Sequence, residues 1–161
     1  IRAEGKNILL DTGIGNKHSV KRRRLFAMDG GKLLQSLNEH GLEPRDIDIV
    51  ALTHLHFDHV GGCTVPGPNG TLLPTFPRAV HMVQRDDWQE ATELNDRTRH
   101  AYLQEDFLPL EENGQLQLIS GNVEIVPGVV IKSIAGNRGT QNKLYLLFGH
   151  RNAQFINVFL L

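Results

Sequence analysis

Short apolar runs, separated by glycine, proline and polar turns, recur along most of the chain. Runs of about four to eight residues rich in Val, Ile and Leu are typical of β-strands. Residues 1–11 predict a hairpin that turns at residues 4–6, and residues 47–53 predict a buried strand. Further strands are predicted at residues 79–83, 115–119, 123–126, 129–135, 143–148 and 154–161.

Helical patterns are fewer and shorter than the strand patterns. Asp29 is a suitable N-cap for a helix that continues to His40. Leu33, Leu34 and Leu37 would lie together on one face of that helix. Further helices are predicted at residues 86–94 and 96–103.

The segments between these elements indicate the fold class. Residues 17–24 predict a basic loop, and residues 65–77, with four of the seven prolines, predict a loop or lid. Strands mixed with helices and followed by a run of strands are typical of an α+β layered domain. We expect a single domain over residues 1–161, belonging to a longer parent and lacking its C-terminal part.

The overall charge gives no general attraction to nucleic acids or acidic membranes, since the formal net charge is -1 and the pI is about 6.8. No apolar run reaches the ~20 residues that a membrane-spanning helix needs. The single cysteine excludes an internal disulfide framework and fits a reducing compartment. We therefore expect a cytoplasmic protein without a nucleic-acid or membrane partner.

Metal-binding side chains are concentrated directly after the predicted strand at residues 47–53. Three of the eight histidines and one aspartate lie there, namely His54, His56, Asp58 and His59. In an extended segment, residues two apart point to the same side, and the following glycine pair allows the chain to bend. Imidazole and carboxylate donors suit zinc or another borderline divalent ion, which lowers the pKa of a bound water to about 7.

The H-x-H-x-D-H string at residues 54–59 resembles the metal loop of the metallo-β-lactamase-fold hydrolases. The likeness extends to the L-D-T-G turn at 10–13, the approach to the loop at 46–50, and the P-G-V at 127–129. R-D-D-W at 85–88 and A-Y-L at 101–103 resemble the branch of N-acyl-homoserine lactonases and organophosphate hydrolases. The resemblance implies an αβ/βα sandwich of two mixed sheets flanked by helices, with metals at one edge of the sheets.

The resemblance also implies roles for individual residues. His54, His56 and His59 would be metal ligands, and Asp58 would be a ligand of a second metal or a catalytic base. Asp11 would orient one of the ligand histidines. The implied cofactor is Zn, as one or two ions, with Mn, Fe or Co as alternatives. The implied reaction is attack of metal-bound hydroxide on a small ester-like substrate, with a lactone first, then a phosphotriester or a thioester.

The later part of the chain departs from the family pattern. The family has a G-H-T-x-G-H stretch after the strand at 129–135, whereas residues 136–141 place Asn137 at the ligand position. The family then supplies a bridging aspartate, and this sequence has no aspartate after Asp106. One alternative is therefore a non-catalytic or truncated member with an incomplete metal site. A weaker alternative is a nuclease that uses the basic residues 21–24.

Other candidates have simpler interpretations. His18 could line the pocket, and a solvated loop is the simpler interpretation of residues 21–24. The apolar C-terminal strand needs a cover, either a missing segment or a second copy in a homodimer. Structural roles are expected for His40, His81, His150, the buried thiol Cys63, and the packing residues Trp88, Tyr102 and Phe107.

Overall fold

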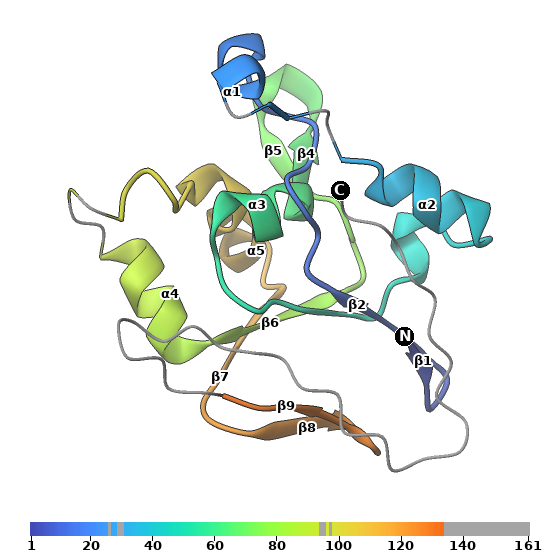
Figure 1. Cartoon of the computed structure of the whole chain (residues 1–161). Coiled ribbons are helices and arrows are strands. Elements are labelled where there is room, and N and C mark those ends of the chain that lie inside the picture. The colour runs from blue at the N-terminus through green and yellow to red at the C-terminus, as the bar shows by residue number, and fades with distance from the viewer. Residues whose placement is uncertain (26, 29–30, 94–95, 97, 134–161) are drawn as a thin grey trace.

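A mixed sheet forms the centre of the molecule (Figure 1). The structure is a computed structural model that describes residues 1–25, 27–28, 31–93, 96 and 98–133. The sheet has five strands in the order β1-β2-β3-β6-β7. Their bounds are β1 (Arg2–Ala3), β2 (Lys6–Leu10), β3 (Ile49–Ala51), β6 (Val80–Gln84) and β7 (Leu116–Ile119).

The one hairpin and three parallel strand pairs of this sheet follow from apolar sequence. β1 and β2 form the predicted hairpin, and β2, β3, β6 and β7 then pair in parallel. Val50 and Ala51 in the middle of the sheet are fully buried, as expected of a parallel strand covered on both faces. Successive side chains alternate between the faces: Leu9 and Val50 belong to one core cluster, and Ile8 belongs to the other.

Different elements cover the two faces of the sheet. The helices lie on one side, and the hairpin of β8 (Val123–Val126) and β9 (Val129–Ile131) lies on the other (Figure 1). This layering of sheet and helices confirms the predicted α+β class. The helices and 3₁₀ turns are α1 (Val20–Leu25), α2 (Leu33–Glu39), η1 (Pro44–Asp46), α3 (Phe57–Val60), η2 (Gly61–Cys63), η3 (Pro68–Gly70), α4 (Arg85–Thr92), η4 (Gln104–Asp106) and α5 (Leu108–Glu112).

Several predicted elements differ from those observed. Residues 65–77 were predicted to form a loop, yet β4 (Thr64–Pro66) and β5 (Leu72–Pro74) pair there as a hairpin. The three-residue strands keep Pro66 and Pro74 at their ends, where a missing amide donor costs least. The basic segment forms helix α1 rather than a loop.

The helix predictions were partly wrong. α2 begins at Leu33 and buries Leu33 and Leu37, but Leu34 is 40% exposed. The predicted cap Asp29 lies outside the described residues, as do the strands predicted at 143–148 and 154–161. The helix predicted at 96–103 is not observed in its described residues, where 96 and 98–101 form turns; the next α-helix along the chain is α5. Within the described part of the chain, no helix is long and apolar enough to cross a membrane.

His81 is buried in the centre of the sheet, on β6, which confirms its structural role. Its side chain is fully buried, and its backbone pairs with β3 and β7. Neither ring nitrogen forms a hydrogen bond of normal geometry. The backbone at Ala79 and Gln115 lies near the ring and raises its pKa slightly. Burial dominates and lowers the pKa of His81 to about 4.

We predict that acid destabilises the fold through His81. Its pKa of about 4 in the folded protein lies below the usual value of about 6.5. As the pH falls, His81 is therefore protonated in the unfolded chain before it is protonated in the folded one. The stability is therefore complete above pH 6.5 and falls by about 3 kcal/mol as the pH drops to 4. Urea unfolding of His81→Leu at pH 7 and pH 4.5 measures this, with His100→Leu, an exposed histidine, as the control. The prediction would be contradicted if the free energy of unfolding fell by the same amount between pH 7 and pH 4.5 in the wild type and in His81→Leu.

Candidate metal centre

The candidate residues lie where neighbouring parallel strands end. Asp11 follows β2, the His-rich loop follows β3, and α4 follows β6. Because β2, β3 and β6 are adjacent and parallel, their carboxyl ends meet at one edge of the sheet (Figure 1). This edge is the usual location of functional sites in parallel sheets.

Asp11 connects the first turn to the His-rich loop. Its backbone is in the left-handed region, with φ at 50°, which is costly for a residue other than glycine. Its carboxylate accepts hydrogen bonds from the amide of Thr53 at 2.8 Å and from the Thr53 hydroxyl at 2.7 Å. It also accepts a hydrogen bond from Nδ1 of His59 at 2.8 Å. The strained residue therefore orients one predicted ligand.

These hydrogen bonds define which ring nitrogens carry protons. The Thr53 hydroxyl gives its proton to Asp11, so Nδ1 of His54, 3.1 Å away, is the donor to Thr53 Oγ1. Nδ1 of His59 donates to Asp11. In both rings Nδ1 carries a proton, so Nε2 is the position left for another partner, either a metal ion or a second proton.

The backbone of His59 is held as firmly as its ring. Its carbonyl accepts hydrogen bonds from the amide of Thr12 at 2.7 Å and from the Thr12 hydroxyl at 3.0 Å. The amide of Gly62 donates to the carbonyl of Gly13 at 3.0 Å. The turn at 11–15 and the end of the His-rich loop are thus in direct backbone contact.

The three predicted ligand histidines lie side by side. The ring centroids of His54 and His59 are 3.9 Å apart, and those of His54 and His56 are 4.5 Å apart. Asp58 is 56% exposed, and its Oδ2 lies 3.7 Å from Nε2 of His59. The local sequence therefore gathers all four residues in one place.

Burial and hydrogen bonding set the protonation of these rings. Burial, followed by the nearby charges of His59 and His56, lowers the pKa of His54 to about 4. Burial also lowers the pKa of His56. The hydrogen bond to Asp11 raises the pKa of His59. Two of the three rings are consequently neutral at pH 7, which is the form that binds metals.

The donor types fit zinc, but the side chains do not converge on one point. Within the ranges that the structure describes, no group of three or more His, Cys, Asp and Glu side chains is arranged to hold a metal ion. The rings instead pack against one another. The fit to a metal therefore rests on the donor chemistry and on the free Nε2 positions of His54 and His59.

Two buried residues near the loop were not recognised as site residues from the sequence. Asp87 on α4 is 1% exposed and accepts a hydrogen bond from the amide of Leu55 at 2.8 Å. The Tyr102 hydroxyl donates to Asp87 at 3.3 Å, and its ring lies edge-on to His56 with centroids 4.8 Å apart. Burial raises the pKa of Asp87 to about 7. Both residues belong to the R-D-D-W and A-Y-L stretches noted in the sequence, but those resemblances do not indicate this contact.

A buried ion pair supports the far end of the loop. Nζ of Lys17 lies 2.6 Å from Oδ1 of Asp106, and both side chains are almost fully buried. Lys17 also donates to the carbonyl of Gly61. Burial raises the pKa of Asp106 against the opposing charge of Lys17. The carboxylate oxygens of Asp106 have no well-aligned hydrogen bond, so this contact is better described as a charge pair than as a hydrogen bond.

The remaining sequence candidates have structural surroundings. His18 is buried, donates to the carbonyl of Ile14 at 2.8 Å and lies edge-on to Phe57. Burial raises the pKa of the Cys63 thiol to about 12, which confirms an inert buried cysteine. Trp88 and Phe107 pack edge to face, as predicted, and His40 ends α2. His150 and Asn137 lie outside the described residues.

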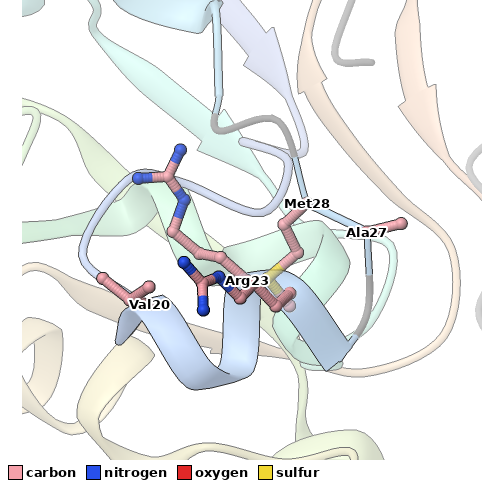
Figure 2. Close-up of a pocket in the computed structure, with 5 residues that line it drawn as sticks. Val20, Arg23, Ala27 and Met28 are labelled. Atoms are coloured by element: carbon pink, nitrogen blue, oxygen red, sulfur yellow. The ribbon is translucent and has the colours of Figure 1, made fainter.

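Helix α1 borders a pocket of about 400 Å³ (Figure 2). The predicted ligands do not line this pocket. Arg22, on the same helix, places its guanidinium 5.0 Å from the centroid of the Phe57 ring. Arg22 thus adds to the contacts that Lys17 and His18 make with the His-rich loop. The pocket is lined by Val20, Arg23, Arg24, Ala27 and Met28.

Comparisons with known proteins show what this chain is similar to. Residues 1–64 match the family model of the metallo-β-lactamase superfamily. An N-acyl homoserine lactonase of Bacillus cereus is 30% identical over 149 residues, covering 85% of this chain and 52% of that protein. The chain spans about half the length of the curated relatives it matches.

Solved structures give the same result. A probable metal-dependent hydrolase from Staphylococcus aureus superposes with a TM-score of 0.73 at 32% identity, over 81% of this chain and 46% of that chain. An N-acyl homoserine lactone hydrolase, with the product N-hexanoyl-L-homoserine at its catalytic metal centre, superposes with a TM-score of 0.63. It is 27% identical over 89% of this chain and 54% of its own.

We predict that Gly61 tolerates no side chain. A Cβ atom there would lie 2.1 Å from the carbonyl oxygen of Ile14, and a backbone atom cannot rotate away. Gly61→Ala should therefore cost about 3 kcal/mol in urea unfolding, although its φ of -56° suits alanine. Gly114→Ala is the control, because its φ is +67° and no atom lies within 4 Å. The control should cost about 1 kcal/mol, and equal costs would contradict the steric explanation.

Proposed function

We propose that this chain, which belongs to the metallo-β-lactamase superfamily, functions as a metal-dependent hydrolase of a small ester-like substrate. The observation that carries the proposal is the hydrogen-bonded set of Asp11, Thr53 and His59 beside His54. A carboxylate that orients a ligand imidazole is a recurrent feature of metal sites. A purely structural loop would have no need for a strained aspartate at this position.

The proposed ligands are His54, His56 and His59. Zinc, as one or two ions, is the expected metal, with Mn, Fe or Co as alternatives; when bound, it supplies Lewis acidity and lowers the pKa of a coordinated water to about 7. His54 and His59 would offer Nε2, since Nδ1 of each donates a hydrogen bond. Asp11 would fix the orientation of the His59 ring and raise its basicity.

Asp58 is proposed as the catalytic base or as a ligand of a second ion. It is the most exposed of the four loop residues, and its carboxylate lies beside Nε2 of His59. From there it could accept the proton of an attacking water while remaining close to the ligand set. This position distinguishes it from the buried Asp87, whose two oxygens are already engaged.

A lactone is the first proposed substrate, followed by a phosphotriester or a thioester. The lactonase of Bacillus cereus and the lactone hydrolase structure support the lactone, because both resemble this chain over more than four fifths of its length. A small-molecule substrate also agrees with the near-neutral charge of the chain.

The decisive experiment is metal analysis of the purified protein together with hydrolysis assays on lactones, esters and phosphotriesters. We expect one or two zinc ions per chain and turnover of a lactone. His56→Ala should lower zinc affinity by at least about 100-fold, more than the loss of an outer partner. His40→Ala is the matched control, because His40 lies at the end of α2 and should leave both readouts unchanged.

Zinc binding without turnover would indicate the non-catalytic alternative. Neither metal above background nor turnover in the wild type would overturn the proposed function. A His40→Ala variant that loses zinc as strongly as His56→Ala would show that binding is unspecific.

A further inference from the structure

We infer that Asp87 and Tyr102 are positioning residues, which hold the backbone around His56 so that its ring faces the proposed metal site. The inference rests on the function proposed above. It concerns a carboxylate and a phenol that contact the His-rich loop from outside and belong to none of the metal-ligand motifs.

The hydrogen bond to Leu55 is the first element of the argument. Leu55 lies between His54 and His56, and its amide donates to Oδ2 of Asp87 at 2.8 Å. The Leu55 side chain is fully buried in the main core cluster. The residue between two proposed ligands is therefore fixed at both its amide and its side chain.

The contact with Tyr102 is the second element. Its ring lies at 67° to the ring of His56, with centroids 4.8 Å apart, and it is only 4% exposed. Its hydroxyl donates to Oδ1 of Asp87 at 3.3 Å. Tyr102 thus limits the rotation of the His56 ring while its hydroxyl engages the second oxygen of Asp87.

The backbone beside Tyr102 supplies the third element. The carbonyl of Ala101 accepts a hydrogen bond from the amide of Phe57 at 2.9 Å. The amides on both sides of His56 are thus bound by Asp87 and by the residue that precedes Tyr102. One side of the loop is held by hydrogen bonds, and the ring of His56 is held by an aromatic contact.

The burial of Asp87 argues against a role in packing alone. A carboxylate that is 1% exposed costs free energy unless its acceptors are used. The Asp87 carboxylate accepts a hydrogen bond from the Leu55 amide, which would otherwise be buried without a partner. If the acceptor is what matters, asparagine at this position should suffice, because its carbonyl oxygen can still bind Leu55.

The test compares Asp87→Ala, Asp87→Asn and Tyr102→Phe with Asp86→Asn, which alters the exposed neighbouring aspartate. Amide exchange and the ring resonances of His56 are measured by NMR on metal-free protein. In Asp87→Ala the Leu55 amide should exchange at least about tenfold faster, as expected for a lost hydrogen bond. The His81 amide, which donates to the Gln115 carbonyl at 2.7 Å in the sheet, should keep its protection, which separates this local effect from unfolding.

Zinc affinity is then measured by competition with a chromogenic chelator. The zinc affinity of Asp87→Ala should be about 10- to 100-fold lower than that of the wild type, as is typical when a residue that holds a metal ligand is lost. Asp87→Asn should stay within about threefold of the wild type, and Tyr102→Phe should fall by about threefold, in keeping with one weak neutral hydrogen bond. Asp86→Asn should match the wild type.

Three outcomes would overturn the positioning role. They are unchanged zinc affinity in Asp87→Ala, a loss in Asp87→Asn as large as that in Asp87→Ala, or unchanged exchange at Leu55. Should Asp87→Ala not fold, unchanged zinc affinity in Tyr102→Phe would count in the same way. If the wild type binds no zinc, the proposed function fails; exchange at Leu55 and the His56 ring resonances then decide the positioning role, and unchanged values overturn it.

Discussion

The site depends on how the loop after β3 satisfies its backbone amides once it has left the sheet. The amides of residues 53, 55 and 57 are bound in turn by the Asp11 carboxylate, the Asp87 carboxylate and the Ala101 carbonyl. His54 and His56 occupy the positions between these three bound amides. Three segments far apart in the sequence are thereby needed to shape one short loop, and the parallel order of β2, β3 and β6 brings two of them to the same edge.

The sequence predicted the sheet and the His-rich loop because both signals are local. The apolar run before His54 and the grouping of donors within six residues need no knowledge of distant contacts. The hairpin of β4 and β5 was missed because its prolines suggested a loop, whereas they stand at the ends of short strands. Asp87 was missed because its role depends on a hydrogen bond to a residue 32 positions away. The ligand roles of the loop residues remain predictions.

Buried charge is the second constraint on this region. Lys17, Asp106 and Asp87 are all buried away from water. An unpaired charge in such a place would cost about 3 kcal/mol or more. Lys17 also binds the carbonyl of Gly61, next to the point where the turn at 11–15 approaches the loop most closely. The close backbone contact at Gly61 and the ion pair therefore reinforce each other. Replacing either partner would leave the other charge buried and would loosen the same turn.

The histidines of the loop are differentiated by their surroundings rather than by their sequence positions. Burial lowers the pKa of His54 and His56, so that a cation could approach them without displacing protons. Asp11 raises the pKa of His59, because its carboxylate stabilises positive charge on the ring, whether that charge comes from a proton or from a metal. Asp11 therefore favours metal and proton alike at Nε2 of His59. Competition between the two at this nitrogen would be the main way in which acidity weakens binding, and the other two rings would contribute little to it.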